Sequence, residues 1–255
     1  MTPAELCQAA FAMPLMSPSY PPGPYRFTDR EHLIITYRTD PEAICAVTPE
    51  PLQVLEGGLV RMEFVRMAGG TGFGRYAAAA QTIPVRLGEE RGSYTHCMFL
   101  DVHAPISGGR ELWGFPQKLA APRLEVAHDV LLGALDYGPE RVATASMGYK
   151  HEAVGEEAAR KAFAEPGYLL KIIPHVDGSP RICELVRVTR SDMIIKGAWR
   201  APASLDLQPH ALAPLCALPV REVISGLHVL ADFTLDLGTV AHDYLQDPDC
   251  GGEAP

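Results

Sequence analysis

The sequence lacks long apolar runs, and no stretch approaches the roughly 20 apolar residues that a membrane-spanning helix needs. Its amino terminus also lacks a basic segment followed by an apolar run, the mark of a secretory signal. The six cysteines stand singly, without a Cys-x-x-Cys pair or zinc-type spacing, and the histidines show no metal-binding spacing. We therefore expect a cytoplasmic protein with no membrane partner, no bound metal and no cofactor.

Positive charge is also scarce: 22 Lys and Arg residues stand against 31 Asp and Glu residues, a net charge of -9. Nucleic-acid phosphates require basic patches, so the composition argues against a nucleic-acid partner. No Gly-x-Ser-x-Gly elbow is present, which leaves serine hydrolysis unsupported. The glycine-rich run 69–74 is followed by another strand-like segment rather than by a helix, so it predicts a β turn and not a phosphate-binding loop.

What is present is a chain of 255 residues, long enough to bury the core of one large domain. Strand-like runs such as 32–37, 59–67 and 94–102 dominate, and most alternate apolar with polar residues, which favours a largely antiparallel sheet. We predict an α+β fold that is mainly β: an antiparallel β-barrel-like domain over residues 1–245, with a central pocket and a few short helices. The tail 246–255 is predicted to be disordered.

Local signals predict individual elements. Apolar spacing favours a short helix within 3–16 and another at 156–163, and a short helical turn is expected at 219–226. Two β-rich runs, 130–138 and 141–149, are joined around a Gly-Pro pair and predict a hairpin.

The stretch from Arg110 to Leu119 draws attention because Lys118 stands among large apolar residues. A lysine amine is nucleophilic only when it is unprotonated, and apolar surroundings disfavour the ammonium form. Lys118 is thus a candidate for capturing a carbonyl group. The alternative is a surface lysine whose stem lies over an aromatic ring such as Phe115.

This stretch and several other segments together resemble the acetoacetate decarboxylase family, in the same order along the chain, from Ser17 to about Tyr244. The segments that carry the resemblance include Gly23-Pro24-Tyr25, Tyr37-Arg38-Thr39-Asp40, Gly133-Ala134-Leu135-Asp136-Tyr137-Gly138, the run 141–151 and the run 177–185. The resemblance implies a barrel-like domain with a central pocket, assembly into a large homo-oligomer, and a lyase reaction on a β-keto acid.

The chain departs from the family at the reaction centre. The resemblance implies two adjacent lysines, of which the first forms a Schiff base, but here the pair reads Gln117-Lys118. An amide nitrogen cannot condense with a ketone. In an extended stretch Gln117 and Lys118 point to opposite faces, so Lys118 reaches the pocket only after a one-residue slip, which Pro116 would permit. A second family carboxylate is replaced by Ala78, which leaves a more neutral pocket.

Other family positions are kept. Arg30 and Glu63 stand at positions that match an active-site arginine and glutamate of the family. Arg30 is suited either to receive the substrate's carboxylate or to orient Glu63, and Glu63 is suited to act as general acid or base, although a structural ion pair is the alternative for both. Gln117 is then a neutral donor to an enolate oxygen. The aromatic residues Phe27, Tyr76, Trp113 and Phe115 are expected to contact the substrate, or simply to fill the core.

The sequence therefore predicts a carbon–carbon lyase of the acetoacetate decarboxylase type whose small-molecule partner is a β-keto acid or a related oxo acid. Either Lys118 substitutes as the nucleophile, or the chemistry is non-covalent and leads to decarboxylation, aldol addition, dehydration or cyclisation. Two alternatives remain: a non-catalytic small-molecule binding protein, and a family enzyme inactivated by an engineered Lys-to-Gln change.

Overall fold

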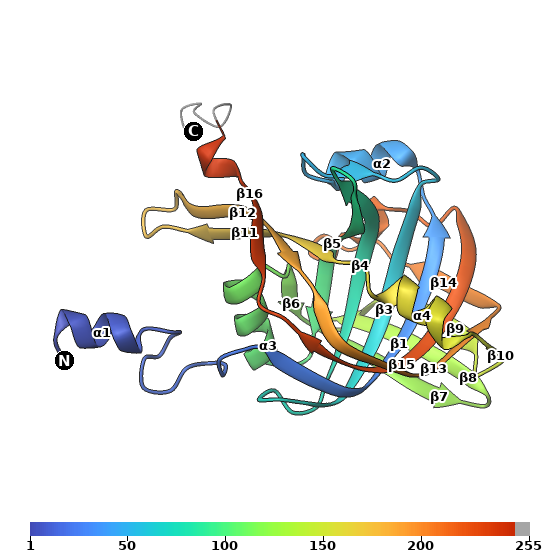
Figure 1. The fold of residues 1–255 in the computed structure, drawn as a ribbon. Coiled ribbons are helices and arrows are strands. Elements are labelled where there is room, and N and C mark those ends of the chain that lie inside the picture. The colour runs from blue at the N-terminus through green and yellow to red at the C-terminus, as the bar shows by residue number, and fades with distance from the viewer. Residues whose placement is uncertain (248–255) are drawn as a thin grey trace.

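The computed structural model describes residues 1–247. Its largest element is a twelve-stranded sheet in the order β10-β13-β15-β1-β3-β4-β5-β11-β12-β16, with β2 added to β4 and β6 added to β5 (Figure 1). The strands of this main sheet are β1 (Tyr25–Arg38), β2 (Gln53–Val54), β3 (Leu59–Gly70), β4 (Tyr76–Leu87), β5 (Glu90–Leu100), β6 (Gln117–Leu119), β10 (Glu152–Ala153), β11 (Gly167–Pro174), β12 (Pro180–Val188), β13 (Arg190–Ala201), β15 (Glu222–Leu235) and β16 (Thr239–Asp243).

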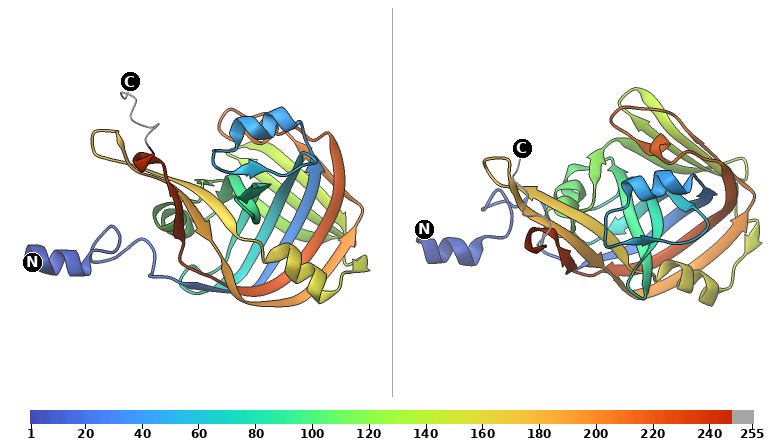
Figure 2. Two further views of the ribbon diagram at one scale, coloured as in Figure 1. Left: turned by 45° about the horizontal axis from the view of Figure 1, so that its top comes forward. Right: turned by 90° about the horizontal axis from the view of Figure 1, so that it is seen from above.

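The main sheet is antiparallel except where β5 pairs with β6 and with β11, which confirms the largely antiparallel prediction. It curls strongly (Figure 2) but does not close. The predicted barrel-like domain is thus open: within residues 1–247 the order of strands ends at β10 and β16, and these two edges do not pair with each other. A barrel closes only when its first and last strands pair, and these end strands are only two and five residues long.

A second, four-stranded sheet covers one face of the main sheet, in the order β14-β9-β8-β7. Its strands are β7 (Ala121–Ala127), β8 (Val130–Tyr137), β9 (Glu140–Gly148) and β14 (Ala203–Leu207). The predicted hairpin at 130–149 is confirmed as β8 and β9. Leu33, Ile35 and Phe64 of the main sheet are fully buried against this second sheet, and an added Cβ on Gly133 would lie 2.6 Å from the Phe64 ring.

Alternation along the strands leaves a different set of side chains on the other face of the main sheet. On β1 these are Arg30, His32 and Ile34, and on β3 they include Glu63 and Val65. Because successive side chains of a strand point to opposite faces, the residues packed on the second sheet and those facing the curl come from the same strands. We call this second surface the inner face.

The helices are short: α1 (Pro3–Ala9), α2 (Pro41–Val47), α3 (His103–Gly108), a π-helical turn η1 (Gly109–Trp113), α4 (Glu156–Phe163) and the 3-10 turns η2 (Leu215–Ala217) and η3 (Tyr244–Gln246). The helix predicted at 156–163 is confirmed, and the first helix ends at Ala9. Figure 1 shows α1 lying well away from the sheets. Within residues 1–247, no helix has the length and apolar character to cross a membrane.

The helical turn predicted at 219–226 is wrong, because β15 already begins at Glu222 and pairs with β1 from that residue. Pairing with a long neighbouring strand outweighs a weak local preference for a turn. Of the tail predicted to be disordered, Gln246 closes the turn η3, and residues 248–255 lie outside the described part of the chain.

Candidate active site

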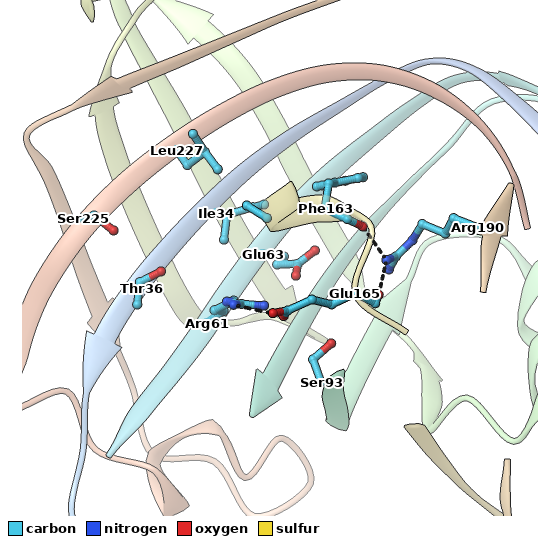
Figure 3. Close-up of a pocket in the computed structure, with 11 residues that line it drawn as sticks. Ile34, Thr36, Arg61, Glu63, Ser93, Phe163, Glu165, Arg190, Ser225 and Leu227 are labelled. Carbon is cyan, nitrogen blue, oxygen red and sulfur yellow. Dashed lines mark hydrogen bonds and ion pairs between the residues drawn. The ribbon is translucent and has the colours of Figure 1, made fainter. Parts of the chain in front are cut away.

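The inner face of the main sheet holds a cavity that is lined by residues of several strands of this sheet, the first being β1 and the last β15. We call it the central cavity; it is lined by Phe27, Arg30, Glu63, Val65, Met67, Tyr76, Ala80, Thr82, Ser93, Thr95, Met98, Phe115, Gln117, Gly167, Val188, Arg190 and Leu235. An outer cavity shares Glu63, Ser93 and Arg190 with it (Figure 3). An inner cavity shares Phe27, Tyr76, Phe115, Gln117 and Leu235 with it and adds further aromatic residues. The three hollows therefore adjoin one another in a row.

Arg30 brings a buried cation to the central cavity. Its guanidinium carbon lies 5.1 Å from the centre of the Phe27 ring and 5.0 Å from that of Phe233. Burial lowers the pKa of Arg30 to about 10, with Tyr76 and Glu63 opposing this shift, so the group remains charged at neutral pH. Among residues 1–247 no carboxylate lies within ion-pair distance of Arg30, and its Nε is buried without a hydrogen-bond partner.

Glu63 is the one carboxylate that lines the central cavity in the described chain. On the neighbouring strand β4, Ala80 lies opposite Glu63 and Ala78 lies opposite Val65, so neither position supplies a second carboxylate. Burial raises the pKa of Glu63, but His32, Arg190 and Arg61 outweigh burial and lower this pKa below its ordinary value. Glu63 Oε2 lies 3.7 Å from His32 Nδ1, a separation too long for a hydrogen bond.

His32 is almost fully buried, and both of its ring nitrogens lack a hydrogen-bond partner among the described residues. Its ring meets that of Phe163 edge-on, with centroids 4.6 Å apart. Burial lowers the pKa of His32 to about 4, so the imidazole is neutral at pH 7. Sequence reasoning did not single out this residue, although its place two residues after Arg30 puts it on the same face of the strand.

Arg190, at the start of β13, is a second, partly buried cation that sequence reasoning missed. Its Nη1 donates to the backbone carbonyl groups of Phe163, at 3.0 Å, and Glu165, at 3.3 Å, as Figure 3 shows. Burial lowers the pKa of Arg190, and Glu63 opposes that shift. No motif in the sequence marks this arginine, because it joins the site only when β13 and the end of α4 meet.

Gln117 occupies the position that the family resemblance gives to the Schiff-base lysine, and its side chain faces the central and inner cavities. Its Nε2 lies 3.5 Å from Met98 Sδ, a weak acceptor, and its Oε1 is buried without a partner in the described chain. The amide therefore keeps most of its hydrogen-bonding capacity for a ligand.

A π-helical turn brings Gln117 to the cavity. Gly109–Trp113 forms the turn η1, and the extended part of this stretch is β6, from Gln117 to Leu119. Gly114 ends the turn with a positive φ of 85°, and an added Cβ there would lie 2.4 Å from Lys171 Cβ. Only glycine accepts both this conformation and this contact. The chain then enters β6 parallel to β5, with Gln117 beside Met98.

Lys118 lies on the opposite side of β6 from Gln117. Its side chain is exposed, and its Nζ donates a hydrogen bond of 2.9 Å to the backbone carbonyl of Leu212. It is absent from the lining of all three hollows. The one-residue slip that would turn Lys118 inward does not occur in this structure.

The four predicted aromatic residues gather at the inner end of the site. Phe27, Tyr76 and Phe115 line both the central and the inner cavity, and Trp113 lines only the inner one. Burial raises the pKa of Tyr76 to about 12, so its phenol is neutral at pH 7. Trp113 is almost fully buried and its Nε1 donates to the carbonyl group of Asp236 at 2.9 Å. Among residues 1–247, no cluster of three or more His, Cys, Asp or Glu residues is suited to a metal ion.

Comparison with known proteins gives consistent results. The family model described as acetoacetate decarboxylase (ADC) matches residues 12–245. An acetoacetate decarboxylase of Chromobacterium violaceum is 63% identical over 246 residues, covering 96% of this chain and 100% of that protein. Acetoacetate decarboxylase 2 of Mesorhizobium japonicum is 62% identical over 92% of this chain and 90% of that protein.

Solved structures agree with the sequence relatives. The acetoacetate decarboxylase of Legionella pneumophila is 46% identical, with a TM-score of 0.89 over 94% of this chain and 96% of that one. The enduracididine biosynthesis enzyme MppR has a TM-score of 0.81 over 92% of this chain and 95% of that one. At 20% identity, the likeness to MppR shows a shared fold alone.

Proposed function

The chain belongs to the acetoacetate decarboxylase family, and from this premise we propose that it is a lyase acting on an oxo acid without a Schiff base. The observation that carries the proposal is the contrast at β6. The residue that faces the cavity is Gln117, which cannot form an imine, whereas the neighbouring amine of Lys118 is bonded outside it. We therefore favour the non-covalent alternative over the substitution of Lys118 for the missing lysine.

Substrate capture falls to Arg30. Its guanidinium is buried beside two aromatic rings and has no carboxylate partner among the described residues. A buried, unpaired cation is unfavourable in the empty protein, and a carboxylate with its planar pair of oxygens satisfies it well. The aromatic residues Phe27, Tyr76 and Phe115 then enclose the rest of the molecule, with Trp113 at the inner end.

The reaction requires a place for negative charge and a route for a proton. When a β-keto acid loses carbon dioxide, the electron pair of the broken bond moves to the ketone oxygen and gives an enolate. The Gln117 amide has a donor to offer to that oxygen. Glu63 is ionised in the empty site because its pKa is lowered, so it first takes a proton from solvent water and then passes that proton to carbon. In aldol addition, dehydration or cyclisation of a related oxo acid, an enolate at the same place forms instead when Glu63, as the base, removes a proton from carbon.

Borohydride trapping with acetoacetate and with pyruvate tests the proposal, followed by mass analysis of the intact protein and its peptides. The acetoacetate decarboxylase of Chromobacterium violaceum is treated alongside as the control for trapping. We expect turnover of an oxo acid by this chain with no reduced adduct. An adduct on Lys118 would overturn the non-covalent mechanism. Ligand binding without turnover of any oxo acid would favour a binding protein instead.

We also propose that the protein is a homo-oligomer, as the family resemblance implies. Exposed apolar side chains on the β11–β12 hairpin and on β16 support this, among them Ile172, Val176 and Val240. Exposed apolar patches on a protein surface often mark contacts with another chain. Sedimentation velocity distinguishes the outcomes, and a monomer at micromolar concentration would contradict the proposal.

A further inference from the structure

The central cavity contains more positive charge than one carboxylate substrate requires. Arg30 and Arg190 both line it, and Glu63 is its one carboxylate in the described chain. The two guanidinium carbons lie 5.0 and 5.7 Å from the centre of the same ring, that of Phe233. Arg61 adds no net charge at the outer cavity, because it pairs with Glu165 at 3.6 Å. The empty cavity therefore has two cations and one anion.

Arg190 is held in place but is not neutralised. Its Nη1 is bonded to two backbone carbonyl groups at the end of α4, and these bonds fix the guanidinium without cancelling its charge. Its Nε and Nη2 form no hydrogen bond or ion pair with any residue of 1–247. A charged group that is largely removed from water is normally paired with an opposite charge. Arg190 is one of the residues that line both the outer and the central cavity, and Figure 3 shows it beside Phe163 and Glu165 at the outer one.

We infer that the substrate is an oxo acid with two carboxylates, one received by Arg30 and the other by Arg190. This inference rests on the proposed function, since it assigns Arg30 the same role. It adds a specificity-determining residue, Arg190, and a substrate class, the oxo dicarboxylic acids. With both carboxylates bound, two cations face three anions unless Glu63 takes up a proton. Binding of a dianion therefore also prepares Glu63 to act as a general acid.

The test compares glutarate with its monomethyl ester, which has nearly the same shape but one charge fewer. Isothermal titration calorimetry on the full chain gives both affinities. Succinate and adipate, a shorter and a longer diacid, test which distance between the two carboxylates fits the site. We expect glutarate to bind about 10- to 100-fold more tightly than the half ester, the range for one charge-assisted contact. Titrations in two buffers of different ionisation enthalpy should show uptake of about one proton with the diacid and none with the half ester.

The variant Arg190→Gln should remove this preference while changing the affinity for the half ester by less than about threefold. Arg190→Lys retains the positive charge and should keep part of the preference for glutarate over the half ester. This variant tests the role of Arg190 even if Arg190→Gln does not fold. Arg221→Gln, a surface arginine paired with Asp40, is the matched control for net charge and should keep the full preference.

The outcomes separate this inference from the proposed function. Equal binding of diacid and half ester by the wild-type protein, no binding of any diacid, or a preference that survives Arg190→Gln would each overturn the dicarboxylate inference. In those cases the role of Arg30 stands if Arg30→Gln abolishes turnover of a monocarboxylate such as acetoacetate. If Arg30→Gln leaves both binding and turnover intact, the proposed function itself fails.

Discussion

Gln117 and Lys118 are neighbours in the chain, yet their side chains lie on opposite sides of strand β6. Gln117 faces the cavity and contacts Met98 Sδ at 3.5 Å, whereas Lys118 donates to the carbonyl group of Leu212 at 2.9 Å. The alternation of a β-strand explains this separation, because a shift of one residue would exchange the two faces. The amine next to Gln117 in the sequence is thus kept out of the central cavity.

Restoring the amine should restore covalent capture. In Gln117→Lys the new side chain extends from the same inward position on β6, where burial and the nearby cations Arg30 and Arg190 favour the neutral amine. We expect borohydride to trap acetoacetate on Lys at position 117 and nowhere else. The matched variant Gln117→Met, of similar size but without an amine, should not be trapped. A folded Gln117→Lys protein with no adduct would show that the rest of the cavity no longer supports imine formation.

Removing the neighbouring amine should have little effect. The Lys118 side chain is exposed and makes its one side-chain hydrogen bond to a backbone carbonyl outside the cavity. For Lys118→Ala we expect turnover to change by less than about twofold and the free energy of unfolding to change by less than about 0.5 kcal/mol. A loss of turnover of about 100-fold or more would assign Lys118 a direct role.

Glu63 should carry the proton transfer. Replacing it by glutamine keeps its shape and removes the exchangeable carboxyl proton, so we expect the turnover number to fall by about 100- to 10,000-fold. The pKa of Glu63 is lowered in the folded protein, so its contribution to stability is present above its ordinary pKa and is lost as the pH falls further. Denaturant titrations at low pH should accordingly show less acid sensitivity in Glu63→Gln than in the wild type. Unchanged turnover would remove Glu63 from the mechanism.

His32 should make the fold sensitive to mild acid. Its pKa in the folded protein is about 4, and in the unfolded chain it is about 6.5. Between these values the unfolded chain binds a proton that the folded protein does not. The contribution of neutral His32 to the free energy of unfolding is therefore fully present above about pH 6.5. It falls by on the order of 3 kcal/mol as the pH drops toward 4.

The variant His32→Leu should flatten this part of the stability profile, whatever its stability at pH 7. Urea titrations at pH 7 and pH 4.5 on both proteins measure the difference. If the free energy of unfolding falls by the same amount between pH 7 and pH 4.5 in both proteins, groups other than His32 control the acid response.

Two glycines near Gln117, Gly109 and Gly114, should respond differently to substitution by alanine. An added Cβ on Gly109 would lie 2.2 Å from Gln117 Oε1, the far end of a flexible side chain, so Gly109→Ala should displace the amide. At Gly114 the Cβ would meet the Lys171 backbone at 2.5 Å, in a conformation with positive φ. We expect Gly109→Ala to lower turnover with a small loss of stability, and Gly114→Ala to destabilise the fold by more than about 1 kcal/mol. Thermal melting and turnover assays separate the two effects, and the reverse ranking would contradict the structure.

Which side chains of a strand share a face was predictable, because this follows from local periodicity. The predicted alternation of run 59–67 is seen on β3, where Glu63 faces the cavity and Phe64 packs on the second sheet. The helix α4 and the hairpin β8–β9 were predicted for the same reason, since their signals lie within a few adjacent residues. Family segments spread along the chain also made the absence of a lysine at Gln117 visible.

What periodicity does not contain is the pairing of distant segments. The main sheet stays open because its edge strands, β10 and β16, do not pair with each other. Strand β15 begins as early as Glu222 because it pairs there with β1. Arg190 and His32 join the site in the same way, the first through contact between the start of β13 and the end of α4, the second through burial beneath Phe163. Local sequence determined which side chains share a face, whereas the tertiary structure decided which faces meet. That difference has a physical cause: backbone alternation acts between neighbours, and burial and charge depend on segments brought together only by folding.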